Sequence, residues 1–524
     1  MNQVEVLRKQ IQYYSYVFGA IVLLMFGQMI GNNGVAYLAI AMETMGLFMV
    51  LLGDNVAEVF GKMLRLRRKR KQFHDALAVK KRIMLLQSVL GAVCFGTVFL
   101  LADLIAAALF QIPNAALIIR VLSPVLFLRM LSTLLIGYFQ GAGAQMPAVF
   151  GSVLRPVLFF ILGKLLCSSF LAYGEKVSAL LKNEDFYGMY GAAGLALSMV
   201  ISEVVILIAL VIFYFIGDRN YDRKRCEKGL HKAERVQDTL QGFYGLGAGG
   251  MGFGFLKRFF VLAALILLVT LEDMGLYYGK YLLLCAIPVL FVGARYYILY
   301  ARLTSAIKNK NGRQVREKLQ IGLQYAWSVG ILAVMLMAVL APYLVNACFP
   351  EDTVLLSMLQ RGSLLILAVI LLAYLIMVQS AHRKKLVSLL TLLGGAVLFV
   401  LLGMLMGSKP GSQPMAAVYA GVISLSIAAI VLGAITISQY HLKLEYVPVF
   451  IMPLVCVGVV GVIVLLMSKL LVPHIGNVVT CLLGILLGIV LYPAALGVCR
   501  VFSENEIQQI YGRLGKKILA VIFK

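Results

Sequence analysis

Long apolar stretches, each about 20 residues in length, recur from one end of this 524-residue chain to the other. A helix rises about 1.5 Å per residue, so about 20 apolar residues span the roughly 30 Å hydrocarbon core of a bilayer. Hydrophobic residues make up 61% of the chain and charged residues only 13%, fewer than soluble domains carry. The stretches lack the short alternating segments of β-barrel strands, so the sequence predicts an all-α polytopic membrane protein.

Glycines, prolines and charged residues divide the apolar stretches into fourteen predicted transmembrane helices. They cover about 11–30, 34–60, 83–110, 115–140, 147–170, 188–216, 245–271, 281–302, 320–345, 354–379, 386–407, 416–438, 447–470 and 477–499. With the N-terminus inside, every strongly basic loop falls on one side, which the positive-inside rule makes cytoplasmic. The net charge of +24 therefore reflects membrane orientation and not nucleic-acid binding, and both termini are expected in the cytoplasm.

An internal repeat is visible when the chain is shifted by 239 residues, which lays Phe110 on Phe349 and Gln140 on Gln379. Six helices separate the matched positions, and an even number keeps both halves in the same membrane orientation. The sequence thus predicts two pseudo-symmetric six-helix bundles plus two extra C-terminal helices. The predicted parts are a bundle over 1–216, a basic cytoplasmic linker over 217–241, a second bundle over 242–445, helices 13 and 14 over 446–499, and a basic cytoplasmic tail over 500–524.

Short motifs carry a resemblance to a known family. They are Arg120-Val-Leu-Ser-Pro124, Gly137-Tyr-Phe-Gln-Gly141 followed by Pro147, and Gly27-Gln-Met-Ile-Gly-Asn-Asn-Gly34. With the helix plan, they resemble the multidrug/oligosaccharidyl-lipid/polysaccharide (MOP) exporter superfamily, in its polysaccharide-biosynthesis and spore-cortex-type flippase branch. The resemblance covers essentially the whole chain. It implies a MATE-like fold, alternating access around a cavity lined by helices 1, 2, 7 and 8, and a polyprenyl-(pyro)phosphate-linked saccharide as cargo.

Three of the cations inside predicted membrane helices lie in helices expected to line the cavity: Lys257 and Arg258 in helix 7 and Arg295 in helix 8. A buried cation costs about 2.5–3.5 kcal/mol even on the lenient insertion scale, so it normally has a partner or a function. Because guanidinium groups bond phosphate oxygens in pairs, we expect these residues to hold an anionic head group. The alternative is that helix 7 starts later and that Lys257 and Arg258 lie among the lipid headgroups. Lipid II flippases carry further cavity arginines on helices 1 and 2, which this chain lacks.

Polar residues at the end of helix 1 and carboxylates in mid-helix give two further hypotheses. Gln28, Asn32 and Asn33 are candidates for binding sugar hydroxyls, or they cap a helix break. Glu43 and Glu203 are candidates for ion coupling through Na⁺ or H⁺, because buried carboxylates in transporters bind such ions. The alternative for both carboxylates is an ion pair with Arg129 or Arg155.

A glycine-rich run opens predicted helix 7 and contains Gly245, Gly249, Gly250 and Gly254. It matches G-x-G-x-x-G formally, but no βαβ unit surrounds it, so a dinucleotide site is rejected. The glycines either allow a bend for gating or let helices pack closely.

Catalysis has little support, because no metalloprotease, nucleophile-elbow or P-loop motif is present and the cysteines are scattered. We expect a flippase in the bacterial cytoplasmic membrane, not an enzyme, with no cofactor beyond a coupling ion. A cation-coupled multidrug exporter is the first alternative. A membrane glycan polymerase or transferase is less favoured, since the longest outer loop, 171–187, is short. Expected partners are the bilayer, the lipid-linked cargo and polysaccharide or peptidoglycan synthesis enzymes, with the protein itself a monomer.

Overall fold

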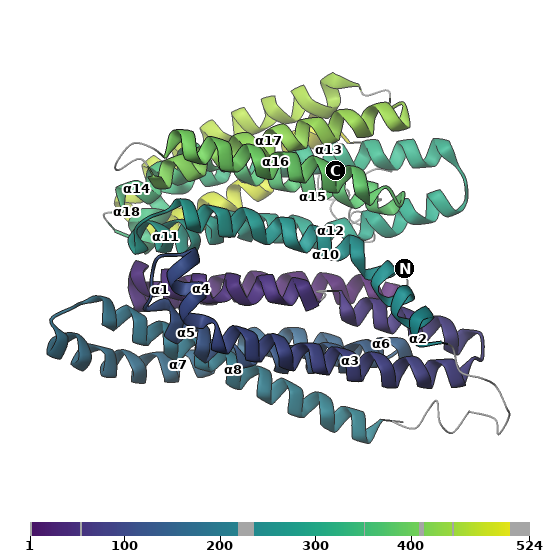
Figure 1. Cartoon of the computed structure of the whole chain (residues 1–524). Coiled ribbons are helices and arrows are strands. Elements are labelled where there is room, and N and C mark those ends of the chain that lie inside the picture. The colour runs from purple at the N-terminus through teal and green to yellow at the C-terminus, as the bar shows by residue number, and fades with distance from the viewer. Residues whose placement is uncertain are drawn as a thin grey trace. The chain divides into compact units, whose positions relative to one another are not determined.

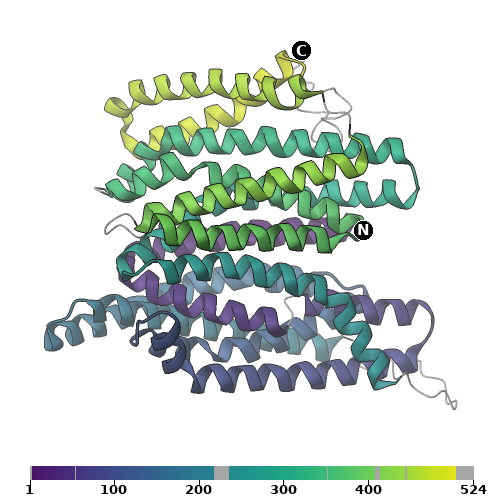
Figure 2. The same ribbon diagram turned by 45° about the horizontal axis from the view of Figure 1, so that its top comes forward.

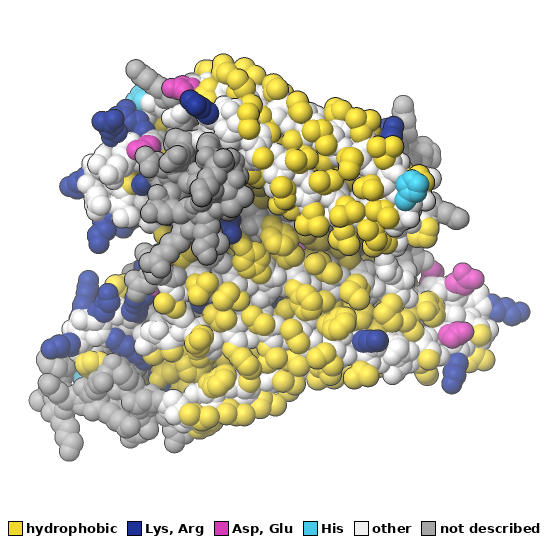
Figure 3. Space-filling model, turned by 180° about the vertical axis from the view of Figure 1, so that it is seen from behind, with side chains coloured by type: hydrophobic (Ala, Val, Ile, Leu, Met, Phe, Trp, Pro, Cys, Tyr) yellow, Lys and Arg dark blue, Asp and Glu magenta, His cyan; other side chains and the backbone are white. Residues whose placement is uncertain are grey.

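The computed structural model describes residues 3–52, 55–217, 235–350, 352–407, 413–442 and 445–502, and the regular elements in these ranges are all helices (Figure 1). Within them, 12 helical stretches are long and apolar enough to cross a membrane. Apolar side chains cover the long faces of the helices, while Lys and Arg gather toward helix ends (Figure 3). The prediction of an all-helical, polytopic membrane protein is confirmed.

Contacts divide the chain into two compact units, residues 2–279 and 280–524. The first unit is built from eleven elements in chain order. They are α1 (Gln3–Leu52), α2 (Val56–Lys69), α3 (Phe73–Leu100), α4 (Ala102–Leu109), α5 (Ala115–Leu122), α6 (Pro124–Ala142), α7 (Met146–Leu181), α8 (Asp185–Ile216), α10 (Val236–Leu267), α11 (Leu271–Gly275) and the start of the π-helix η1 (Leu276–Leu282). The unit boundary therefore lies later than the predicted start of the second bundle at 242, since α10 and α11 group with the first unit.

The second unit begins within η1 and holds eight further elements. They are α12 (Leu283–Lys308), α13 (Gly312–Cys348), α14 (Thr353–Gly362), α15 (Leu364–Ala381), α16 (Lys385–Met406), α17 (Gln413–Tyr440) with the short π-helix η2 (Val447–Ile451), and α18 (Met452–Val498). Most of the predicted linker, 218–234, and most of the tail, 503–524, lie outside the described residues.

The internal repeat is reflected in the helix boundaries. α3 begins at Phe73 and α13 at Gly312, and α7 begins at Met146 and α16 at Lys385, so both pairs of starts are 239 positions apart. Likewise, the α5–α6 pair falls on the α14–α15 pair. These helices of the two repeats are thus related by the 239-residue shift, although α10 and α11 group with the first unit.

Two of the long helices are hairpins that turn at one glycine. Gly31 (φ 71°, ψ 174°) breaks α1, and Gly476 (φ 75°, ψ 171°) breaks α18. A positive φ is cheap only for glycine, which explains the residue type at both turns. The turn at Gly31 brings the first arm of α1 beside α2, which follows the second arm: Lys9 Nζ lies 3.3 Å from Glu58 Oε2. Figure 2 shows the arms of α18 side by side at the yellow end of the colour bar.

Several predicted boundaries were wrong in the same direction, because polar residues continue the helices. α7 runs to Leu181, where the sequence suggested an outer loop over 171–187. α10 starts at Val236 and not at 245. Predicted helix 8, 281–302, is preceded by α11 and η1, so the helical path runs from Leu271 to Lys308. Polar side chains such as Glu175 and Lys176 are good helix formers, and hydropathy alone misses such extensions.

Candidate functional site

The carboxylate of Glu43 lies deep in the first unit and is bonded to Arg258. Glu43 is on the second arm of α1 and is 2% exposed. Arg258, on α10, donates from Nη1 to Oε1 at 2.8 Å and to Oε2 at 3.0 Å. A buried carboxylate without a partner is costly, so the guanidinium accounts for how Glu43 can be charged there. The structure thus joins a residue predicted to couple ions with one predicted to bind cargo.

Tyr278 completes this group from the π-helix η1. Its hydroxyl donates to Glu43 Oε1 at 3.1 Å. The glycines on either side of it, Gly275 and Gly279, bring η1 close to α1: a Cβ at Gly275 would collide with the Asn32 carbonyl, and one at Gly279 with Val35. π-helical turns are uncommon and occur often at functional sites. We refer to Glu43, Arg258 and Tyr278 as the buried ion cluster.

Gly46 provides the space for the Arg258 side chain. A Cβ built on Gly46 would lie 2.6 Å from Arg258 Cζ and 2.7 Å from its Nε. Gly46 follows Glu43 by three residues, so both share one face of the helix. Gly46 and Tyr278 were not predicted from the sequence. The three-residue spacing of Glu43 and Gly46 could have indicated that both lie on one helix face, whereas Tyr278 fell in the predicted loop between helices 7 and 8.

The other predicted cations are in different surroundings. Lys257 is exposed, and among the described residues no ion-pair partner is found for it. Adjacent helical residues point about 100° apart, which explains why Lys257 does not follow Arg258 toward Glu43. Arg295 lies on α12 in the second unit, where it is partly buried and has contacts of its own. The predicted group of three cations therefore stays a prediction.

Glu203 forms a second buried ion pair, between α7 and α8. Arg155 donates to it from two nitrogens, Nε to Oε1 and Nη2 to Oε2, the latter at 3.1 Å. The Glu203 side chain is 3% exposed, and the charge of Arg129 acts on it as well. Arg155 is one of the two partners expected from the sequence.

The polar residues at the turn of α1 divide into two kinds. Asn33 Nδ2 donates to Asp185 Oδ1 at 2.9 Å and so ties the start of the second arm to the start of α8. Asn32 directly follows the Gly31 turn and packs against Gly275. Gln28 is exposed on the first arm. Asn33 thus has a structural bond, while sugar binding by any of the three stays a prediction.

The glycine run does not break its helix. α10 is continuous from Val236 to Leu267, so a bend in the form of a break at this run is not observed. Gly250 packs against Asn55, whose side-chain amide a Cβ would hit, whereas a Cβ at Gly245 would meet nothing within 4 Å. Gly254 is partly buried in the helix, and the surroundings of Gly249 lie outside the described residues. Close packing is therefore the observed role at Gly250.

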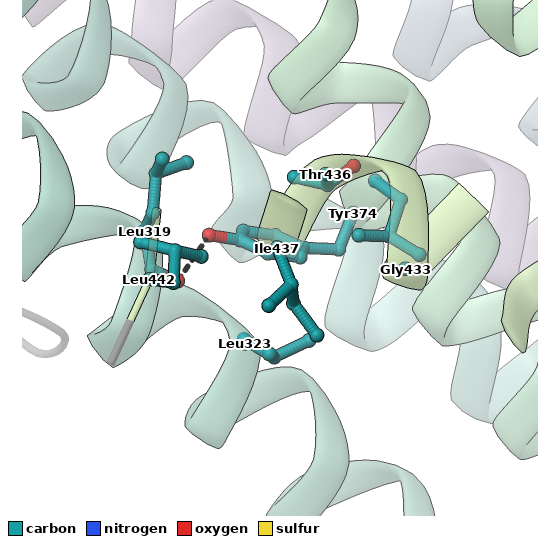
Figure 4. Close-up of a pocket in the computed structure, with 8 residues that line it drawn as sticks. Leu319, Leu323, Tyr374, Gly433, Thr436, Ile437 and Leu442 are labelled. Carbon is teal, nitrogen blue, oxygen red and sulfur yellow. Dashed lines mark hydrogen bonds between the residues drawn. The ribbon is translucent and has the colours of Figure 1, made fainter. Parts of the chain in front are cut away.

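A small hollow in the second unit is too apolar to serve as a cargo site. It is lined by Leu319, Leu323, Tyr374, Leu375, Gly433, Thr436, Ile437 and Leu442 (Figure 4). The Tyr374 hydroxyl donates to the Leu319 carbonyl at 2.8 Å, and the Thr436 hydroxyl donates to the Leu432 carbonyl at 2.7 Å. Both hydroxyl protons are thus used within the protein.

Comparison with known proteins shows the fold. No family model and no curated protein matches the chain. Among solved structures, an inward-facing multidrug resistance MATE family transporter of the MOP superfamily superposes with a TM-score of 0.65 at 14% identity, over 83% of this chain and 96% of that one. Lipid II flippase MurJ in an inward closed conformation gives a TM-score of 0.65 at 14% identity, over 94% of this chain and 98% of its own. A crystal structure of MATE in complex with MaD3S gives 0.57 at 15% identity, over 84% and 99%. The chain therefore has the MATE/MurJ-like fold.

Proposed function

We propose that the protein is a flippase that moves a polyprenyl-(pyro)phosphate-linked saccharide from the cytoplasmic to the outer leaflet of a bacterial cytoplasmic membrane by alternating access. The observation that supports this most is the buried ion cluster, which holds the Arg258 guanidinium within a membrane helix beside the exposed Lys257. Two adjacent cations on one membrane helix suit an anionic cargo, because cations attract phosphate and repel cationic drugs.

The ion cluster gives a physical route for cargo exchange. When no cargo is bound, Glu43 neutralises Arg258, and Tyr278 adds a donor to the same carboxylate. A phosphate that bonds the guanidinium competes with Glu43 for it. Glu43 then needs a new counter-charge, which a proton or Na⁺ supplies. Cargo binding and ion uptake would be linked in this way through one arginine.

The same proposal implies a membrane topology. Each arm of the α1 and α18 hairpins counts as one crossing, which turns the 12 apolar stretches into fourteen crossings with both termini in the cytoplasm. The match to lipid II flippase MurJ extends over 94% of this chain, and the match to the inward-facing MATE transporter over 83%. The longer alignment favours the flippase plan. We expect a monomer that receives cargo from membrane-bound saccharide synthesis enzymes.

The test is transport in proteoliposomes with a fluorescent polyprenyl-pyrophosphate saccharide. Lys257→Glu should lower the initial rate about 10-fold or more, since a charge-assisted bond contributes about 1.5–3 kcal/mol. Lys164→Glu is the matched control, because Lys164 is also an exposed lysine within a membrane helix, α7. Equal rates for the wild type and both variants would contradict an anionic cargo at this site.

A cation-coupled multidrug exporter is the second candidate function. The observation that favours it is the pair of buried carboxylates, Glu43 and Glu203, in a fold shared with MATE transporters. This function predicts uptake of a lipophilic cationic dye driven by a Na⁺ or proton gradient. Glu43→Gln should abolish that uptake, and charge reversal at Lys257 should leave it intact. The flippase proposal predicts no dye transport by the wild type.

A further inference from the structure

Two cysteines that are distant in sequence lie next to each other in the second unit. The Sγ atoms of Cys456 and Cys499 are 3.6 Å apart, although 43 residues separate them. Cys456 is on the first arm of α18 and is 3% exposed. Cys499 directly follows the second arm and is exposed. The pair therefore lies at the open end of the hairpin, away from its turn at Gly476.

Hydrogen bonds from α13 hold the chain on both sides of this pair. Gln324 Nε2 donates to the Val501 carbonyl at 2.7 Å, just after Cys499. Trp327 Nε1 donates to the Phe450 carbonyl at 3.2 Å, shortly before Cys456. Both arms are thus fixed to the same helix near their cysteines, and the short distance between the thiols is a built feature of the unit.

We propose that Cys456 and Cys499 form an oxidation site at which hydrogen peroxide produces an intramolecular disulfide. The exposed Cys499 reacts first: its sulfur attacks the peroxide O–O bond, takes up one oxygen as sulfenic acid and releases water. Cys456 then attacks the Cys499 sulfur, and the hydroxide that leaves takes the Cys456 proton to form a second water. One electron from each sulfur reduces the peroxide oxygens, so the reaction balances.

The different exposure of the two cysteines explains why Cys499 reacts with the peroxide and Cys456 forms the disulfide. A peroxide reaches Cys499 because that side chain is exposed, and susceptibility to oxidation follows exposure. Cys456 is shielded and serves as the resolving thiol, which stops Cys499 from oxidising further. In the orientation proposed above, this end of α18 faces the cytoplasm, where thiols are kept reduced. The disulfide would form under oxidative conditions and tie the two arms together at their open ends.

Other cysteines of the same unit provide a comparison. Cys348, at the end of α13, is exposed, and Cys481, on the second arm of α18, is buried. Cys285 is buried in α12. The experiment must therefore identify which sulfurs are joined, and Cys348→Ser is the matched control.

The test uses the purified full-length protein, reduced, freed of reductant and treated with hydrogen peroxide. After free thiols are alkylated, mass spectrometry of the digested protein should show a peptide that joins Cys456 to Cys499, with equal loss of both thiols. Cys348→Ser should leave this peptide unchanged. Cys456→Ser should abolish it and leave Cys499 as sulfenic acid that a dimedone probe traps.

Three results would overturn the proposal, and all can be read from the wild type if a variant fails to fold. The first is Cys499 oxidised to sulfinic acid while Cys456 is still alkylated. The second is Cys499 joined to any cysteine other than Cys456, including one in another molecule. The third is both thiols surviving peroxide in full. The measurement needs no transport, so its outcome is independent of the flippase proposal.

Discussion

The two units contain helices related by the 239-residue shift but differ in their most deeply buried polar contacts. In the first unit, two ion pairs each include a carboxylate side chain that is 3% exposed: Arg258 with Glu43 and Arg155 with Glu203. In the second unit, buried phenol hydroxyls donate to backbone carbonyls, as Tyr281 does to Gly362 at 2.9 Å and Tyr296 to Ile370 at 2.9 Å. The ion pair of the second unit, Lys280 with Asp352, is less deeply buried, with side chains 17% and 16% exposed. Among the described residues, the ion pairs with the most deeply buried carboxylates thus lie in the first unit.

This difference has energetic consequences. Removing one partner of a buried ion pair leaves a charge in a medium that solvates it poorly, which costs about 3–5 kcal/mol. Removing a neutral hydrogen bond costs about 0.5–1.5 kcal/mol. Either member of an ion pair can also exchange its partner for another ion, whereas a phenol–carbonyl bond has no such exchange. The first unit therefore contains the more deeply buried of the contacts that another ion could exchange.

The largest effect is expected from breaking the Arg155–Glu203 pair. Arg155→Met should destabilise the protein by about 3–5 kcal/mol, because it leaves the 3% exposed Glu203 side chain without its main counter-charge. The measurement is thermal unfolding in detergent. The double variant Arg155→Met/Glu203→Leu should recover most of the loss. A double variant no more stable than the single one would show that the pair is not the cause.

Gly46→Ala should have the next largest effect, because the new methyl group occupies the space of the Arg258 guanidinium. Overpacking of this kind costs about 1–3 kcal/mol and should separate Arg258 from Glu43. Thermal unfolding and the transport assay together measure it. Gly245→Ala is the matched control, since a Cβ there meets nothing within 4 Å. Equal losses of stability and transport in both variants would show that the effect comes from general helix packing and not from the displaced Arg258 side chain.

A smaller effect is expected in the second unit from Tyr374→Phe. This change removes the bond from the Tyr374 hydroxyl to the Leu319 carbonyl and should cost about 0.5–1.5 kcal/mol. Tyr446→Phe is the control, because Tyr446 is 67% exposed. If Tyr374→Phe destabilised as much as Arg155→Met, the contrast between buried ion pairs and neutral hydrogen bonds would be refuted.

The smallest effect is expected for the pH dependence of stability, through His382 in the turn after α15. The ring centroid of His382 lies 4.3 Å from that of Tyr440. Burial lowers the pKa of His382 from its ordinary 6.5; a bond to the Val378 carbonyl opposes this shift and the Lys384 charge adds to it. The folded protein therefore binds this proton less readily than the unfolded chain. The contribution of neutral His382 to the free energy of unfolding is fully present above pH 6.5 and is lost as the pH falls through the lowered pKa.

His382→Phe tests this expectation because it keeps an aromatic ring against Tyr440 but cannot take up a proton. Unfolding temperatures measured from about pH 8 down to about pH 5 should fall more steeply for the wild type than for the variant. Parallel curves would assign the acid sensitivity to other groups, with the carboxylates of the first unit as the next to examine.

The sequence predicted the helices well because membrane crossing imposes a strong pattern. Gly31 and the break before 477 were found as helix ends, and the repeat was found from residues such as Gln140 and Gln379. The partner of Glu43 could not be found in this way. Arg258 is 215 positions away, and hydropathy does not say which helices are neighbours. Tyr278 was missed for a different reason: a π-helical turn has no recognisable apolar period.

The single-glycine turns of α1 and α18 have a consequence for how the chain is made. Two apolar helical arms joined by one residue, Gly31 or Gly476, have no loop that could be translocated after the first arm has entered a bilayer. Each pair should therefore leave the ribosome and enter the membrane together, as a preformed helical hairpin. A substitution such as Gly31→Val would then act during synthesis, and its effect would be seen as reduced insertion before any effect on the finished protein could be measured.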